Sequence, residues 1–190
     1  MWCKPIKEEI CLKTHLICKK EIENIITIII PRHINRSQKI KTLCNKLGLS
    51  VQILNDEESI HDDKEIIIVN SFGELLKYFK YSKSVFMGKS LIKKLQEVGG
   101  QNPIEAAKMD CRIYHGPFVY NFKEIYELFK FHNISEEING ERELAEKLLI
   151  DLKSSEEKKE IKSEIINNLG NEILQKSLEE IKGIFKSANI

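Results

Sequence analysis

The sequence predicts an α/β fold in which a Rossmann-like parallel sheet carries helices on both faces. Short β-branched runs alternate along the chain with longer stretches whose apolar residues recur at helical spacing. The runs are almost wholly apolar, as expected for strands that are covered on both sides. We see no internal repeat and no low-complexity linker. These features are typical of successive βαβ units.

The elements can be placed in order from these patterns. We predict strands at 24–30, 51–54, 66–69, 84–87 and 111–114. We predict helices at 10–23 and 36–47, one beginning near Ser71, one beginning at Asn102, and one over 121–131. From about residue 141 only helical spacing remains. We therefore divide the chain into a Rossmann-like domain, 1–140, and a segment of amphipathic helices, 141–190, that packs on the domain or extends it.

Composition narrows the class of protein. The 190 residues carry a formal net charge of +1, which gives no support to nucleic-acid binding through a broad basic surface. No apolar run approaches the ~20 residues that a membrane span needs, and no signal peptide is visible. The five cysteines form no C-x-x-C pair and are expected to be reduced core thiols. These totals predict a soluble globular protein.

In open α/β sheets, ligands bind beyond the carboxyl ends of the strands, so the loops that follow predicted strands are the candidates. Four loops qualify, and they contain the sequences PRH, NSFGEL, GKS and GGQNPIE. They supply one arginine, several glycines and two expected capping boxes, Ser71 with Glu74 and Asn102 with Glu105. An arginine can bind a phosphate through two hydrogen bonds, and a carboxylate can accept from ribose hydroxyls. Together they favour a nucleotide or nucleotide-sugar site, although each glutamate alone could be only a cap.

Other signals are weaker. The GKS sequence lacks the glycine that a P-loop needs before it, and no G-x-G-x-x-G is present. His61, Asp62 and Asp63 lie in an acidic loop without a distant partner, so we predict no metal site. His115 lies in a turn with Gly116 and Pro117, where a structural or ligand-contacting role is expected.

Read in order, PRH, GEL, FMGKSL, GGQNPIEAA and HGPFVYNF resemble the C-terminal half of bacterial 3-deoxy-D-manno-octulosonic acid (Kdo) transferases. The resemblance runs from about Ile10 to Phe131. It implies the donor-binding domain of a two-domain GT-B glycosyltransferase. The implied nucleotide contacts are Pro31, Arg32, Phe72, Gly73, Glu74, Asn102, Pro103, Ile104 and Glu105. The implied donor-site neighbours are Gly88, Lys89, Ser90, Gly100 and Asn121.

The resemblance also implies an activity. Such enzymes transfer Kdo from CMP-Kdo to a lipid A precursor of lipopolysaccharide at the cytoplasmic face of the bacterial inner membrane, without a cofactor or a metal. Their catalytic base, acceptor surface and membrane anchor belong to the N-terminal domain. We therefore expect no catalytic residue in this chain, and we expect it to need an N-terminal acceptor domain or chain.

Two departures leave alternatives open. The family begins this half with a loop resembling S-x-H-x-G-E-E, whereas this chain reads KPIKEE and keeps only Glu8 and Glu9 of that loop. The usual Gly-Gly-Ser is Gly88-Lys89-Ser90. A nucleotide-binding module without transfer activity, or a GT-B enzyme that uses another nucleotide sugar, are the alternatives.

Overall fold

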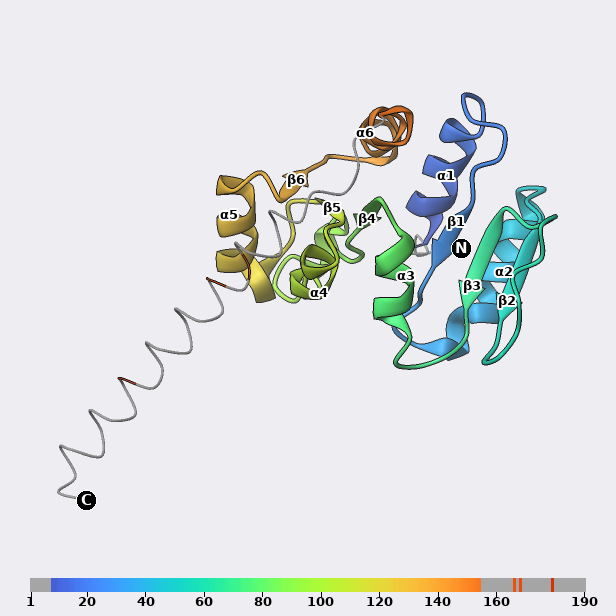
Figure 1. The fold of residues 1–190 in the computed structure, drawn as a ribbon, viewed down its shortest axis with the longest axis horizontal. Coiled ribbons are helices and arrows are strands. Elements are labelled where there is room, and N and C mark those ends of the chain that lie inside the picture. Colours follow the sequence, from blue (N-terminus) through green and yellow to red (C-terminus); the bar gives the residue numbers. More distant parts are fainter. Residues whose placement is uncertain (1–7, 155–165, 167, 169–178, 180–190) are drawn as a thin grey trace, which may run out of the picture.

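The protein folds around two three-stranded parallel sheets (Figure 1). The structure, a computed structural model, describes residues 8–154 together with residues 166, 168 and 179. In the described part, strands and helices alternate from α1 to α6, so the predicted parallel α/β class is confirmed. The expected single sheet is instead two three-stranded sheets among these residues.

The first sheet has the order β1-β3-β2, with β1 at Thr27–Ile29, β2 at Val51–Leu54 and β3 at Ile66–Val69. Strand β3 lies in the middle and is buried along its whole length. Its register pairs Ile67 with Ile28 on one side and with Gln52 on the other. A central strand needs apolar residues on both faces, and the run IIIV supplies them.

The second sheet has the order β4-β5-β6, with β4 at Ser84–Phe86, β5 at Arg112–His115 and β6 at Ser135–Glu137. Strand β5 is central and pairs in parallel with both neighbours. Strand β6, with the sequence Ser-Glu-Glu, was not predicted. A polar three-residue edge strand has no apolar run to reveal it, and only its pairing with β5 defines it.

Helices cover both faces of each sheet. Helices α1 (Glu9–Cys18) and α2 (Ser37–Lys46) pack on one face of the first sheet, and α3 (Leu75–Tyr81) packs on the other. In the second sheet, α4 (Ile104–Lys108) and α5 (Lys123–Phe131) share one core with strand β5. Helix α6 (Glu141–Lys153) covers the opposite face. The described residues also contain short 3-10 helices at Ile34–Arg36, Lys93–Leu95 and Tyr120–Phe122.

Helices α1 and α6 lie side by side although they are far apart in the sequence (Figure 1). The Thr14 hydroxyl donates to the Glu141 carbonyl at 3.3 Å, and the Cys18 thiol points to the Ala145 carbonyl at 3.8 Å. This contact joins the helical layers of the two sheets. Helix α6 thus packs on the second sheet and on α1, while the division of the chain into 1–140 and 141–190 stays a prediction. The remaining predicted tail helices lie outside the described residues.

Cysteines behave as core residues. Cys18, Cys44 and Cys111 are buried, and Cys11 is half-buried. Burial raises the pKa of the Cys44 thiol to about 11. Cys11, Cys18 and Cys44 carry free thiols, which fits the predicted role of core cysteines.

Candidate functional site

The first predicted loops lie at the carboxyl ends of β1 and β3. Pro31 is buried, which fixes the chain as it leaves β1, and Arg32 beside it is exposed. After β3, Phe72 has 73% of its surface exposed and Gly73 adopts a left-handed backbone with φ of 84°. An added Cβ at Gly73 would meet nothing, so conformation and not space favours glycine there.

The expected capping box at Ser71 does not form. Helix α3 begins four residues after Ser71, at Leu75, and the Ser71 hydroxyl lies 3.5 Å from the Glu74 carboxylate. Glu74 also lies 3.6 Å from the Lys77 ammonium group. The Glu74 carboxylate therefore lies between the Ser71 hydroxyl and the Lys77 ammonium group.

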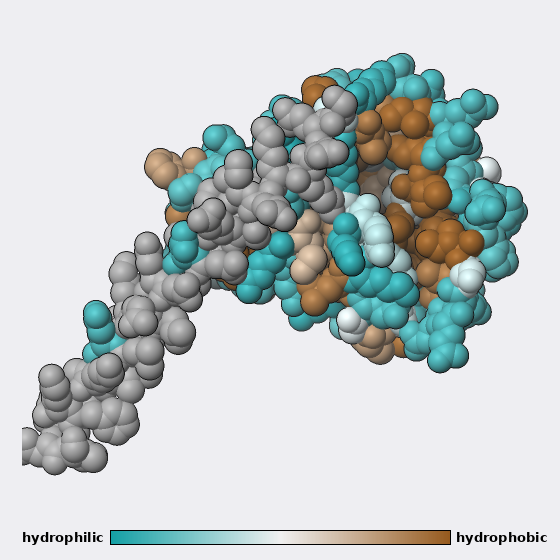
Figure 2. Space-filling model, in the orientation of Figure 1, coloured by the Kyte–Doolittle hydropathy of each residue, from teal (hydrophilic) through white to brown (hydrophobic). Residues whose placement is uncertain are grey.

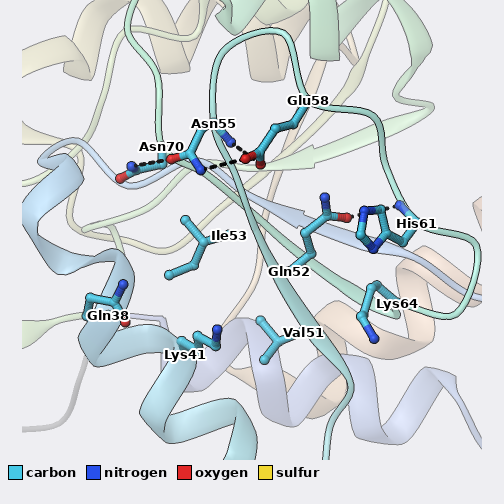
Figure 3. Close-up of a pocket in the computed structure, with 10 residues that line it drawn as sticks. All are labelled: Gln38, Lys41, Val51, Gln52, Ile53, Asn55, Glu58, His61, Lys64 and Asn70. Atoms are coloured by element: carbon cyan, nitrogen blue, oxygen red, sulfur yellow. Dashed lines mark hydrogen bonds between the residues drawn. The ribbon is translucent and has the colours of Figure 1, made fainter.

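Amide side chains join the loops of the first sheet to one another. The Ser37 hydroxyl donates to the Asn70 side-chain oxygen at 2.9 Å. The Asn70 amide in turn donates to Asn55, which holds the Glu58 carboxylate at 2.9 Å (Figure 3). Side-chain hydrogen bonds thus connect the loops after β1, β2 and β3 at the carboxyl end of the first sheet. Ser37 and Asn55 were missed in the sequence because a lone polar residue after a strand resembles any turn residue.

The second set of predicted loops is fastened by Ser90. This residue is fully buried, its hydroxyl donates to the Met87 carbonyl at 2.6 Å, and it accepts from the Gly116 amide at 2.8 Å. Lys89 adopts a left-handed backbone with φ of 68°. Ser90 therefore links the loop after β4 to the loop after β5. Gly88 and Lys89 directly precede Ser90 in the chain, so this link also fixes their position.

The glycine pair of GGQNPIE is needed for close packing. A Cβ on Gly99 would lie 2.4 Å from the Phe118 carbonyl oxygen, and one on Gly100 would lie 3.0 Å from the Val119 Cα. The Asn121 side chain donates to the Val98 carbonyl at 3.2 Å. Asn121 thus holds the glycine loop against the loop after β5.

The Asn-Pro step begins α4 much as predicted. The Asn102 side-chain oxygen accepts from the Ile104 amide at 3.0 Å, which is a helix-capping bond, and Pro103 is buried behind it. The helix itself is only Ile104–Lys108, and no hydrogen bond in the described residues returns from Glu105 to Asn102, so the reciprocal half of the capping box was wrong. Glu105 is exposed and its carboxylate is available to a ligand.

Two arginines follow β1, and they behave differently. Arg36 binds Glu8 through two nitrogens, with Nε at 3.1 Å from one carboxylate oxygen. This pair ties the start of α1 to the loop after β1. Arg32 makes no ion pair within the described residues and is free to meet an anion.

His115 is a buried aromatic neighbour of these loops. Its Nδ1 lies 2.8 Å from the Gly116 carbonyl, and its ring lies 4.3 Å from the Tyr126 ring. Burial lowers its pKa, and its Nε2 has no hydrogen-bond partner among the described residues. The buried position fits the structural role, and the alternative ligand-contacting role stays a prediction.

The predicted residues fall into two loop groups, one at each sheet. The first group contains Pro31, Arg32 and 72–74. The second contains 88–90, 100, 102–105 and Asn121. Hydrogen bonds connect loops within each group, whereas no hydrogen bond in the described residues links one group to the other.

Neither of two pockets in the described part is lined by the predicted nucleotide residues. A pocket of about 420 Å³ runs beside strand β2, with the side chains of Lys41, Gln52 and His61 around it (Figure 3). A second, of about 340 Å³, lies between α1 and 91–94, where Lys13, Lys93 and Lys94 meet apolar neighbours.

Within the described residues, no group of three or more metal-ligating side chains could hold an ion. None of the helices found there is long and apolar enough to cross a membrane.

Comparison with known proteins supports the resemblance. No known family profile matches the chain. A 3-deoxy-D-manno-octulosonic acid transferase of Haemophilus influenzae is 26% identical over 171 residues, which are 90% of this chain and 38% of the relative. The transferase of Aquifex aeolicus is 24% identical over 140 residues, 74% of this chain and 37% of the relative. The chain therefore spans less than two fifths of the length of these curated relatives.

Among solved structures, the C-terminal CMP-Kdo binding domain of WaaA from Acinetobacter baumannii superimposes with a TM-score of 0.71 at 22% identity. The match covers 90% of this chain and 85% of that domain. This likeness establishes the fold as that of a GT-B C-terminal domain. In sequence and in fold, the chain matches the C-terminal half of 3-deoxy-D-manno-octulosonic acid transferases.

Proposed function

We propose that this chain is the donor-binding part of a glycosyltransferase that moves Kdo from CMP-Kdo to a lipid A precursor. The observation that carries the proposal is the likeness in fold to a CMP-Kdo binding domain, combined with exposed Arg32 and Glu105 at the carboxyl edges of the two sheets. Nucleotides bind at this edge in open α/β folds.

The exposed groups have complementary chemistry for a nucleotide. The free guanidinium of Arg32 would bind the CMP phosphate through two hydrogen bonds. The Glu105 carboxylate would accept from ribose hydroxyls, and a phosphate would be disfavoured beside it. Phe72 offers an exposed aromatic face to the base. The Asn102 cap and the Ser90 joint would position these groups without touching the donor's reacting atoms.

Transfer would need residues that this chain does not supply. We place the catalytic base and the acceptor surface in a separate N-terminal domain or chain, so the chain alone would bind the donor without transferring it. In this proposal the assembled enzyme works at the cytoplasmic face of the bacterial inner membrane and uses neither metal nor cofactor.

A calorimetric titration with CMP tests the donor site. We expect CMP to bind, UMP to bind at least about tenfold more weakly, and Arg32→Ala to weaken CMP binding about 10- to 100-fold through loss of a charged hydrogen bond. Arg142→Ala is the matched control, because Arg142 is an exposed arginine on α6. Equal binding of UMP would point to another nucleotide sugar, and no nucleotide binding would favour a degenerate module.

A second assay tests transfer. The chain would be mixed with the N-terminal part of the Haemophilus influenzae relative, CMP-Kdo and a lipid A precursor. Kdo transfer that requires both parts is expected. CMP binding without transfer in the mixture would favour a nucleotide-binding module.

A further inference from the structure

The larger of the two pockets runs along the outer side of strand β2. Three consecutive residues of the strand, 51–53, form its floor, with Lys41 of α2 on one side and His61 and Lys64 of the following loop on the other (Figure 3). We propose that this β2 groove binds an extended acidic segment of a partner protein as an added strand. The inference goes beyond the nucleotide site, because none of the implied nucleotide contacts lines the groove.

The position of the groove follows from the two faces of β2. Val51 and Ile53 pack with the core under α2. Gln52 lies on the opposite face, where its side chain donates to the Ser59 carbonyl at 2.9 Å and accepts from the His61 amide at 3.0 Å. A single pocket that is lined by all three strand residues therefore lies at the outer edge of the strand, with α2 on one side and the loop on the other.

The outer edge of β2 presents open backbone groups to the groove. The Ile66 amide donates to the Ser50 carbonyl at 3.0 Å. Alternate residues of a parallel strand bond to the same neighbour, so Gln52, like Ser50, faces β3. The amides and carbonyls of Val51 and Ile53 therefore point into the groove, and no hydrogen bond between described residues reaches them. An extended peptide can pair with both the amides and the carbonyls, whereas a small anion can use only the amides.

The charge of the groove indicates which peptide fits. Helix α2, with the sequence SQKIKTLCNK, contains three lysines and no acidic residue. Lys41 is half-buried beside the groove and makes no ion pair within the described residues. On the loop side the charges are already paired, because Asn55 donates twice to the Glu58 carboxylate at 2.9 Å and Lys64 pairs with Asp63. An acidic side chain that faces α2 would therefore complete the groove by pairing with Lys41.

Two other occupants fit the groove less well. The right-hand rim of the molecule, where α2 and β2 lie in Figure 1, is mostly hydrophilic (Figure 2), so a large apolar protein face has little to bury there. A second copy that paired its β2 antiparallel to this one would place both lysine-bearing α2 helices on one face of the joined sheet. The two acidic loops, 55–65, would meet on the other face. Like charges disfavour both contacts.

Amide hydrogen exchange, followed by NMR on the 190-residue chain, tests the groove. The probe is a capped ten-residue peptide of alternating glutamate and threonine, which places all its carboxylates on one side of an extended strand. The amides of Val51 and Ile53 should exchange fast in the chain alone and at least about tenfold more slowly with millimolar peptide. The amide of Gln52, which bonds to β3, is the internal control. A peptide of alternating lysine and threonine should give no such protection.

A charge reversal at Lys41 tests the α2 side of the groove. In Lys41→Glu, the affinity for the glutamate peptide, measured by fluorescence anisotropy, should fall about tenfold, because an ion pair is replaced by a repulsion. Lys39→Glu is the matched control, since it changes the net charge equally at an exposed position of α2 that does not line the groove. If circular dichroism shows that Lys41→Glu is unfolded, Lys41→Gln replaces it and should weaken binding about threefold.

Three results would overturn the proposal. One is unchanged exchange of the Val51 and Ile53 amides with millimolar glutamate peptide. Another is an equal loss of affinity in Lys41→Glu and Lys39→Glu, since binding would then depend on overall charge and not on the groove. The third is slow exchange of both amides without peptide, because another part of the chain or a second copy would then occupy the edge. The CMP titration does not involve these residues, so either proposal can fail alone.

Discussion

The hydroxyl of Ser90 holds the Gly116 amide at 2.8 Å, and this single bond joins the loops that follow two neighbouring strands. The same hydroxyl donates to the Met87 carbonyl. Ser90 is fully buried, so both bonds are shielded from solvent. The shape of the second loop group depends on this joint.

Replacing Ser90 by alanine should lower the free energy of unfolding by about 1–3 kcal/mol, because the buried Gly116 amide loses its acceptor. Urea unfolding followed by circular dichroism gives the value. Thr42→Ala is the control, since its hydroxyl bonds to the Gln38 carbonyl at an exposed site and should cost well under that amount. An equal loss of unfolding free energy in both variants would contradict the role of Ser90 as a stabilising link between the two loops.

Gly99 is expected to tolerate no side chain. Its added Cβ would lie 2.4 Å from the Phe118 carbonyl and 2.8 Å from the Leu95 carbonyl, both of them backbone atoms. Gly99→Ala should cost at least about 2 kcal/mol of unfolding free energy and disturb the glycine loop. At Gly88 the nearest atom is the Gln101 side chain at 3.5 Å, so Gly88→Ala is the matched control. Thermal unfolding of the two variants compares them, and equal midpoints would refute the packing argument.

Glu65 should make stability depend on pH in the acid range. Burial opposes its charge, but hydrogen bonds from Lys19, Ser50 and His15 prevail and lower the pKa of Glu65 to about 2. A folded pKa below the unfolded one stabilises the fold above about pH 4.5, and this contribution is lost as pH falls toward 2. The difference corresponds to at most about 3 kcal/mol.

Urea unfolding of Glu65→Gln at pH 7 and pH 3 measures this contribution. The variant should be less stable than the parent at pH 7, with a smaller gap at pH 3. Glu146→Gln, at an exposed position of α6, should leave the pH dependence unchanged. A gap that stays constant between the two pH values would show that Glu65 contributes no such effect.

Asp151 anchors α6 to the second sheet. Its carboxylate accepts from the Tyr114 hydroxyl at 2.8 Å and from the Ser84 hydroxyl at 2.5 Å, and its side chain is 9% exposed. Asp151→Ala should cost about 3 kcal/mol, because two hydroxyls lose their acceptor. Lys153→Ala, which removes an exposed ion pair with Glu21, should cost at most about 1 kcal/mol.

A double-mutant cycle of Tyr114→Phe with Asp151→Ala isolates the hydrogen bond itself. We expect a coupling energy of about 1 kcal/mol or more from chemical unfolding. Additive losses would mean that Asp151 acts through packing alone.

Much of the fold was predictable because apolar runs mark buried strands. Strands β2 and β3 have the predicted bounds, 51–54 and 66–69. Helix α3 begins later than predicted because Ser71 does not cap it, and β6 was missed because its residues are polar. The residues of the site loops were found in the sequence by their place after strands. Their use as nucleotide contacts stays a prediction.

By itself, the sequence determined the α/β class, the order of the apolar strands with their helices, and which loops follow those strands, since these follow from periodicity and short-range turn chemistry. Tertiary structure alone decided that Ser90 is a buried link between two loops, that Arg36 is paired with Glu8, and that β3 is the central strand of the first sheet. The physical reason is that pairing across the sheet joins residues far apart in the chain. A linear pattern shows how apolar a strand is, but not which neighbour it has.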